Sequence, residues 1–306
     1  MEPTKKLILS IGIPAYNEEA NILNLIQRIL DQTRENYELK EIVINSDGSS
    51  DNTVEQVLKA NNPIVRVLDN KDRIGKIKRI NQLINELTGD VIALIDADVV
   101  PTTLDTFDKL IKPFIDSDVV YVSGKPIPLS PTTFIEHAAV YSRSVWDKIR
   151  KEFKNGNSIY TCHGTLYAFR SEFAKENNFP DTIWADIGFH YLVCRNKNLK
   201  YKSAPDANAY FRAPQTIKDY LNQIARYKKE DQALFDYFGT NIKTEYDIPV
   251  SMVNRYKLEA LIAHPLHILA IFILNSYSNF ANKLTNNNAK AGWAVINSTK
   301  AVINEK

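Results

Sequence analysis

The sequence predicts an α/β fold in which a mostly parallel, Rossmann-like sheet is flanked by helices. Two observations indicate it: apolar runs of strand length, and amphipathic helical patterns between them. Strands that alternate with helices pair in parallel, because each helix crosses back over the sheet before the next strand begins. We expect this alternation over residues 7–13, 17–30, 41–45, 54–60, 64–68, 75–87 and 90–98.

The residues of this first part justify each element in turn. Its strands are short runs rich in Ile, Val and Leu, as expected for a parallel sheet that is covered on both faces. Gly48 suits a tight turn after the second strand, and Ser50 or Asp51 is placed to cap the helix that follows. The first helix has an apolar stripe at the helical period, formed by Ile22, Leu25, Ile26, Ile29 and Leu30.

The pattern is less regular after residue 101. No strand pattern is present in the last seventy or so residues, so we expect the chain to end in helices. Between these parts we expect a helix over 104–114, a strand over 119–124, a helix over 133–150, a strand with a turn over 160–169, and a helix over 217–238.

Composition excludes several classes of protein. The 306 residues contain 38 Lys and Arg and 36 Asp and Glu, a formal net charge of +2, so no nucleic-acid partner is expected. Cys162 and Cys194 form neither a disulfide framework nor a metal motif, and we expect both to be buried as small apolar side chains. The N-terminal segment resembles a first strand more than a signal peptide, so cytoplasmic placement is expected.

Polar clusters follow three of the expected strands. In open parallel sheets, ligands bind outside the carboxyl ends of the strands, so these clusters should converge on one edge. The last of them holds Asp96 and Asp98, which would point the same way in an extended chain. They either form a solvated strand end or bind a hard divalent cation. The clusters are "PAYNEE" (14–19), "NSDGSSDNT" (45–53) and "DAD" (96–98).

Four segments in order carry a resemblance to a known family. Over residues 7–235 the chain resembles the family 2 glycosyltransferases, which have the GT-A fold. The resemblance implies a catalytic domain over 1–235, with a nucleotide-binding half (1–100) and an acceptor half (101–235), followed by a helical extension over 236–306. The segments are "IPAYNEE", "DGSSDNT", "GKIKRIN" and "DAD".

The resemblance also implies a donor site. Asp96 and Asp98 match a DxD motif, in which the first acid lies by the ribose and the last contacts Mg²⁺ or Mn²⁺. Such a cation neutralises the charge that grows on the nucleoside diphosphate as it leaves. Lys76 matches a position near the nucleotide. Positions that hold the base and ribose of a nucleotide-diphosphate sugar are matched by Pro14, Tyr16, Glu18 and Asp47.

Inverting transfer also needs a base that takes the proton of the acceptor hydroxyl. In the family this is an acid, often in an "ED" pair before an apolar helix, and Asp186 occupies that position. Ala185 stands where glutamate is common. The alternative for Asp186 is an acid in the first turn of a helix, and one residue can serve both purposes.

Two further segments resemble parts of the family's site. "QIARY" (223–227) is similar to the QxxRW motif, with Gln223 and Arg226 matching and Tyr227 in place of tryptophan. Arg226 could contact diphosphate oxygens, although an ordinary amphipathic helix explains the same pattern. His163 and Gly164 match a turn that lines the acceptor and sugar pocket, and His190 is expected to pack within its helix.

The most apolar stretch is 258–280, which contains Glu259, two histidines and Pro265. Three interpretations stay open: a helix packed on the catalytic domain, an interfacial helix, and a spanning anchor. Basic and aromatic residues around it favour contact with a membrane surface through residues 255–283. We therefore expect a cytoplasmic protein, peripheral on the inner face of the cell membrane.

Together these features predict a metal-dependent inverting glycosyltransferase that moves a single sugar from a UDP- or GDP-sugar to a saccharide or lipid-linked acceptor. Such an enzyme would act in glycan or cell-envelope biosynthesis. A polyprenyl-phosphate glycosyltransferase is the alternative within the class. Outside it stand a nucleotidyltransferase, which would need a glycine-rich phosphate loop that "IGIPAYNEE" does not supply, and a non-catalytic sugar-nucleotide binder.

Overall fold

The computed structural model describes residues 6–184, 186–284 and 300, and the side chains of 280–284 are outside the description. The chain forms two compact units. Within the described residues, the sheet unit comprises 6–127 and 162–211, and the helical unit comprises 128–161, 212–284 and 300. Ala185 and the end of the extension expected over 236–306 lie outside the described residues.

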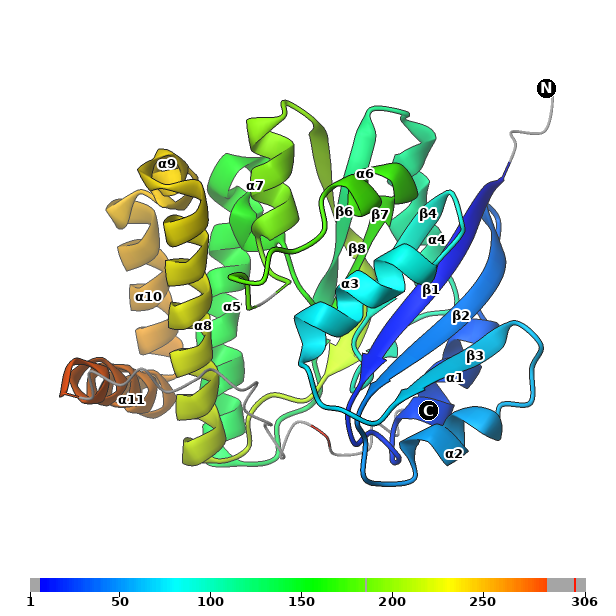
Figure 1. The fold of residues 1–306 in the computed structure, drawn as a ribbon. Coiled ribbons are helices and arrows are strands. Elements are labelled where there is room, and N and C mark those ends of the chain that lie inside the picture. The colour runs from blue at the N-terminus through cyan, green and yellow to red at the C-terminus, as the bar shows by residue number, and fades with distance from the viewer. Residues whose placement is uncertain (1–5, 185, 285–299, 301–306) are drawn as a thin grey trace. The chain divides into compact units, whose positions relative to one another are not determined.

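The sheet unit is built on an eight-stranded sheet, counted over the described residues, with the order β3-β2-β1-β4-β7-β6-β8-β5 (Figure 1). The first four strands in this order pair in parallel, which confirms the parallel sheet predicted for the first hundred residues. Strand β7 then joins β4 antiparallel, as does β6 with β7 and β5 with β8. The strands are β1 (Leu7–Ala15), β2 (Tyr37–Asp47), β3 (Val65–Asn70), β4 (Val91–Ile95), β5 (Val100–Pro101), β6 (Val119–Pro128), β7 (Leu166–Arg170) and β8 (Lys200–Phe211).

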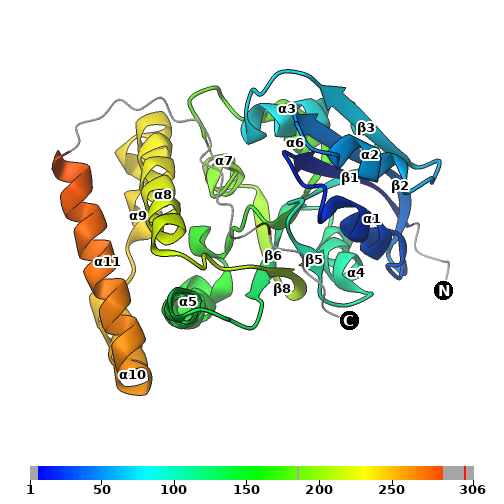
Figure 2. The same cartoon turned by 90° about the horizontal axis from the view of Figure 1, so that it is seen from below.

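Helices cover both faces of this sheet, as the sequence predicts. One core cluster joins the strands to α1, α2 and α4, and α3 buries its own apolar stripe on the opposite face. Figures 1 and 2 show α3 and α1 on opposite sides of β1. The helices of the sheet unit are α1 (Ile22–Leu30), α2 (Thr53–Leu58), α3 (Lys76–Glu86), α4 (Thr106–Ile111), α6 (Ser171–Glu176) and α7 (Phe189–Asn196), with a 3₁₀ turn at Lys112–Ile115.

Several predicted boundaries are wrong for physical reasons. The helix expected over 17–30 begins only at Ile22, because the backbone of residues 17–19 bonds to the loop after β2 instead. Strand β4 ends at Ile95, and Ala97 and Asp98 form a turn, so strand alternation does not set the orientation of the two acids. The strand expected over 160–169 begins at Leu166.

The helical unit consists of long helices packed on one another. Its apolar clusters join α5 to α10 and α5 to α8 and α11. Thr133 and Thr216 cap α5 and α8 by accepting backbone N–H groups at 3.1 Å. The helices are α5 (Phe134–Glu152), α8 (Ile217–Phe238), α9 (Lys243–Tyr246), α10 (Val250–Ala263) and α11 (Pro265–Leu284), with 3₁₀ turns at Phe153–Gly156 and Thr240–Ile242.

Helix α8 continues through residue 235, and the functional boundary expected there stays a prediction. The apolar stretch 258–280 is divided between α10 and α11, because Pro265 cannot continue the first helix and begins the second. Among the described residues, no helix combines the length and apolar character that crossing a membrane requires.

Candidate active site

The loops after β1 and β2 form one hydrogen-bonded layer at the carboxyl edge of the sheet. The backbone N–H of Glu18 donates to Thr53 Oγ1 at 2.7 Å, and that of Asn17 donates to Ser49 Oγ at 3.1 Å. The two strands are parallel and paired to their last residues, so their loops start side by side. The predicted convergence of these clusters is confirmed. Asp51 accepts the N–H of Thr53, the first residue of α2, at 3.0 Å, although the N-cap position itself is Asn52.

Three predicted donor residues lie in this layer. Pro14 and Tyr16 are half-buried, and Glu18 is buried with its carboxylate accepting from Asn21 Nδ2 at 3.1 Å. The guanidinium of Arg73 lies 4.0 Å from the centre of the Tyr16 ring, a cation–π contact. The sequence reasoning missed Arg73, because nothing in the pattern distinguishes it from the exposed Lys71 nearby.

Asp47 is the last residue of β2 and is buried. Its Oδ1 accepts the Ile74 N–H at 2.8 Å and Arg79 Nε at 2.9 Å, and its Oδ2 accepts the Gly75 N–H at 3.0 Å. The carboxylate therefore ties the start of α3 to the end of β2. Arg79 was also missed, because an arginine within an amphipathic helix is usually assigned to the solvated face.

The centre of the site is a cluster of acids around a lysine. Lys76 is the first residue of α3, and its Nζ lies 2.6 Å from Asp96 Oδ1 and 3.0 Å from Asp186 Oδ2. The hydroxyl of Tyr167 on β7 donates to Asp186 Oδ2 at 2.8 Å. The structure thus brings together three predicted residues from distant parts of the sequence, and it adds Tyr167.

The charges in this cluster perturb one another. Burial raises the pKa of Asp96 above its ordinary value, and the carboxylates of Asp186 and Asp98 add to the effect while Lys76 opposes it. Burial alone would lower the pKa of Lys76, but Asp186 and Asp96 outweigh burial and leave that pKa raised. Burial and Asp186 raise the pKa of Tyr167, so its hydroxyl stays a donor.

The donor set suits Mg²⁺ or Mn²⁺. Asp96 and Asp98 would supply hard oxygen ligands, and Lys76 pairs with the carboxylate of Asp96 at 2.6 Å. Among the residues that the structure describes, no group of three or more Asp, Glu, His or Cys side chains could hold a metal alone. Mg²⁺ is commonly held by one or two carboxylates together with substrate phosphates, and Asp96 and Asp98 fit this arrangement.

Gly164 is placed against the carboxylate of Asp186. A Cβ built at this position would lie 2.7 Å from Cγ and 2.9 Å from Oδ2 of Asp186, so a larger residue does not fit. The Gly164 carbonyl accepts from Lys76 Nζ at 3.4 Å, and the N–H of the preceding His163 donates to Ser123 Oγ at 2.9 Å. The predicted turn therefore adjoins the acid cluster.

Gln223, Arg226 and Tyr227 lie on α8 in the helical unit. There, Nε of Arg226 is 3.4 Å from Glu230 Oε1, and its guanidinium lies 5.5 Å from the centre of the Tyr227 ring. Their part in a site formed by the sheet unit stays a prediction.

Two cysteines and a histidine have the packing roles expected of them. Cys162 and Cys194 are free and buried. His190 lies on α7 with 1% of its surface exposed, and its Nε2 lies 2.8 Å from the Asn177 carbonyl oxygen, to which it donates. Burial lowers the pKa of His190 to about 4.

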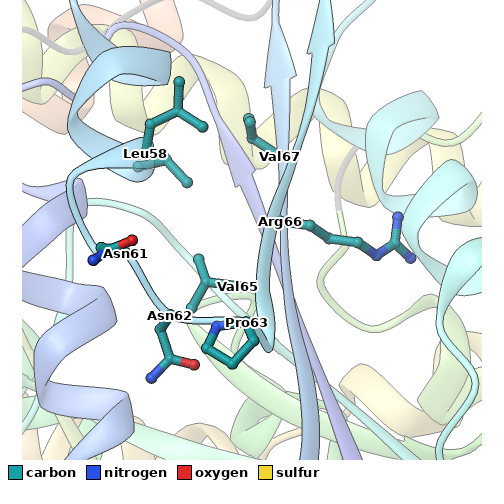
Figure 3. A pocket seen from close by; sticks show the side chains of 8 residues that line it. Leu58, Asn61, Asn62, Pro63, Val65, Arg66 and Val67 are labelled. Carbon is teal, nitrogen blue, oxygen red and sulfur yellow. The ribbon is translucent and has the colours of Figure 1, made fainter.

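A separate pocket adjoins edge strand β3 and α2 (Figure 3). Arg66 extends from the strand to pair with Glu41 at 3.3 Å and Glu86 at 3.4 Å. The lining has no carboxylate or imidazole. It consists of Val57, Leu58, Asn61, Asn62, Pro63, Val65, Arg66 and Val67.

Comparison with known proteins identifies the family. The model of glycosyl transferase family 2 matches residues 10–177, more than half of the chain, and the chain therefore belongs to this family. A poly-beta-1,6-N-acetyl-D-glucosamine synthase of Staphylococcus aureus is 27% identical over 252 residues, which cover 79% of this chain and 60% of the relative. One from Staphylococcus epidermidis is 25% identical, covering 78% and 58%. The chain thus spans about 60% of the length of these relatives.

Solved structures show the same fold. A mannosyltransferase from Pyrobaculum calidifontis in complex with GDP-Man and Mn²⁺ has a TM-score of 0.61 at 19% identity, covering 93% of this chain and 77% of that one. Glucosyl-3-phosphoglycerate synthase from Mycobacterium tuberculosis, in complex with Mn²⁺, UDP and phosphoglyceric acid, has a TM-score of 0.55 at 16% identity, covering 76% and 79%. The fold is the GT-A fold, as predicted.

Proposed function

We propose that the protein is a metal-dependent inverting glycosyltransferase that moves a sugar from a UDP- or GDP-sugar to a saccharide or lipid-linked acceptor. The observation that carries the proposal is the cluster of Lys76, Asp96 and Asp186, with contacts of 2.6 and 3.0 Å, at the carboxyl edge of the sheet. In a family 2 chain, this edge is where the donor's diphosphate would lie.

At the donor end of the proposed site, positive charge would stabilise the diphosphate. Asp96 and Asp98 would hold Mn²⁺ or Mg²⁺, which neutralises charge on the departing diphosphate. Lys76 adds a positive charge from the start of α3, next to these acids. Tyr16 offers an aromatic face to the base, and the adjoining Arg73 adds a second cation at this edge.

The acceptor end uses Asp186 as the base. The acceptor hydroxyl attacks the anomeric carbon on the face opposite the diphosphate and gives its proton to the carboxylate of Asp186. A bond forms from the acceptor oxygen to the anomeric carbon, and the bond from that carbon to the diphosphate oxygen breaks, so the configuration inverts. Lys76 and Tyr167 fix the Asp186 carboxylate at 3.0 and 2.8 Å.

The similar proteins support a nucleotide-sugar donor and a saccharide product. GDP-Man and UDP occur in the complexes of the two similar structures, and the curated relatives are named as synthases of an N-acetylglucosamine polymer. These names support a role in glycan or cell-envelope biosynthesis. Transfer of a single sugar stays the prediction made from the sequence, and the length of the product chain tests it.

The outer face of α11 supports peripheral attachment to the inner face of a cell membrane. Residues 265–282 contain no Asp, Glu, Lys or Arg. The polar side chains of Asn275 and Ser278 face α8, where they accept hydrogen bonds from Tyr220 and Lys228. An apolar face free of charge favours an interfacial position in lipid. Side chains that are 51–71% exposed form this face: Leu266, Leu269, Phe272, Ile273 and Tyr277.

Thermal-shift screening of nucleotide sugars with and without Mn²⁺ tests the enzymatic proposal. A ligand that binds only the folded state raises the melting temperature by mass action. We expect a UDP- or GDP-sugar to raise it only with Mn²⁺, Asp98→Ala to abolish this shift, and Asp118→Ala, at an exposed position, to retain it.

Two outcomes separate the alternatives. Asp186→Asn should keep the Mn²⁺-dependent shift and lose transfer, whereas a non-catalytic binder would keep its cellular role in this variant. A polyprenyl-phosphate glycosyltransferase would charge a lipid carrier. If no nucleotide sugar shifts the melting temperature under any condition, the proposal is wrong.

A further inference from the structure

Trp184 stands two residues before the proposed base Asp186, and its side chain is 45% exposed. Of the large apolar side chains exposed on the described part of the sheet unit, it is the one with an aromatic ring. Trp146 in the helical unit shows the usual arrangement, because it is half-buried and stacks on Tyr160 with the ring centres 5.9 Å apart. Burial of an indole stabilises a fold strongly, so an exposed indole next to a reacting group indicates a surface for a ligand.

The segment that carries Trp184 connects α6 to α7, and hydrogen bonds hold its first residues against two helices. Asn81 on α3 binds Phe179 twice: its Nδ2 donates to the Phe179 carbonyl at 2.8 Å, and its Oδ1 accepts the Phe179 N–H at 2.9 Å. On α7, Nε2 of His190 donates to the carbonyl of Asn177 at 2.8 Å. The segment is therefore anchored on α3 and on α7.

The chain is also held on both sides of Trp184. Before it, Ile183 donates its N–H to the Pro180 carbonyl at 3.0 Å, and its side chain is buried. After it, Asp186 is buried and accepts from the Tyr167 hydroxyl at 2.8 Å. The indole thus extends from a backbone that buried side chains hold in place, so a ligand that packs on it loses little binding energy to ordering the segment.

The spacing puts the indole within reach of an acceptor at the base. Two residues of extended chain span about 7 Å, so the Cα atoms of Trp184 and Asp186 can be no farther apart than this. The face of an aromatic ring is electronegative, and the C–H groups on one face of a pyranose ring carry a slight positive charge, so the two rings stack. A polyprenyl phosphate, whose phosphate oxygen would attack, offers no ring at this distance.

We propose that Trp184 is an acceptor-binding residue that stacks on a pyranose ring, and that the attacking hydroxyl therefore belongs to a saccharide. This inference rests on the proposed function and narrows its acceptor class, since it excludes a lipid phosphate as the attacking group. A contact made equally in the ground state and the transition state lowers KM and leaves kcat unchanged.

Indole fluorescence tests the contact without turnover. Trisaccharides of N-acetylglucosamine, mannose or glucose, the sugars in the names of the similar proteins, are titrated into native protein that holds Mn²⁺ and UDP or GDP. We expect at least one trisaccharide to change the emission, and Trp184→Phe to abolish this change. Trp146→Phe is the matched control, because it alters the packed tryptophan of the helical unit, and it should retain the change.

Calorimetric titration and steady-state kinetics with the same trisaccharide measure the size of the contact. Trp184→Ala should weaken binding of the trisaccharide and raise its KM by about tenfold, as expected for the loss of one aromatic contact, and Trp184→Phe should lose less. The dissociation constant of the nucleotide and kcat at saturating trisaccharide should stay within about twofold of the native values, which also shows that each variant is folded.

Three results overturn the inference. They are native affinity for the trisaccharide in Trp184→Ala, a native emission change in Trp184→Phe, and a native protein that binds its nucleotide but none of the trisaccharides. In the last case, transfer to a polyprenyl phosphate in detergent micelles would identify a lipid phosphate as the acceptor. Failure of the native protein to bind UDP or GDP with Mn²⁺ is a separate result, which contradicts the proposed function.

Discussion

Gly164 provides the sharpest test of the position assigned to the base. Alanine at this position would place its Cβ 2.7 Å from Cγ of Asp186, whereas carbon atoms in contact lie about 3.5–4.0 Å apart. Gly164 is not among the glycines with φ between +20° and +160°, so alanine introduces no backbone strain there. The effect of Gly164→Ala should come from this clash alone.

The expected loss of kcat follows from the short distance between the added Cβ and Cγ of Asp186. The carboxylate must move by about 1 Å, which lengthens its contacts with Lys76 and Tyr167, and a misplacement of this size costs about 10²-fold in rate. Donor binding depends on the other end of the site, so the dissociation constant of the donor should change by less than about threefold. This is well below a tenfold change, which corresponds to about 1.4 kcal/mol.

The assay measures kcat for release of nucleoside diphosphate from the donor found by thermal shift, together with the dissociation constant of that donor. Asp118→Ala is the control, because the side chain of Asp118 is 79% exposed and the residue lies outside the proposed site. A folded Gly164→Ala protein that turns over at the native rate would refute the placement of Asp186 as the base.

Three further predictions concern single contacts. Tyr167→Phe removes one hydrogen bond to the buried Asp186 and should lower kcat about tenfold, with donor affinity retained in calorimetric titration; an unchanged kcat contradicts the role of Tyr167. His190 has a pKa of about 4 when folded and about 6.5 when unfolded. The contribution of the buried neutral imidazole to the free energy of unfolding is therefore complete above pH 6.5 and is lost as the pH falls toward 4. In urea unfolding, the free energy of unfolding of His190→Phe should therefore fall by about 3 kcal/mol less on acidification than that of the native protein. An equal fall in both proteins would contradict the assignment of this pH dependence to His190. Thr133→Ala should lower the free energy of unfolding by about 1 kcal/mol, since Thr133 caps α5, and no change would show that the cap is dispensable.

Local periodicity was enough to predict the parallel half of the sheet. The strands and helices up to residue 95 follow from runs and stripes of neighbouring residues, and parallel pairing follows from their alternation. The first turn of the helix expected from residue 17 was wrong, because its backbone N–H groups bond to residues 49–53, and no local pattern contains that pairing.

The candidate site shows the same difference between what local patterns predict and what contacts between distant residues decide. Lys76, Asp96 and Asp186 were found because each stands in a recognisable motif, and the structure adds that they meet. Tyr167 was missed because its position depends on the antiparallel pairing of β7 with β4. Arg79 was missed because its partner Asp47 lies 32 residues earlier in the sequence.

Anomalous diffraction at the manganese edge, from crystals grown with Mn²⁺ and UDP or GDP, tests directly whether Asp96 and Asp98 hold the cation beside the diphosphate. We expect one strong peak bonded to a carboxylate oxygen of Asp98 and to the diphosphate, with Lys76 nearby. A diphosphate bound elsewhere in the protein, or a manganese peak remote from Asp96 and Asp98, would contradict it.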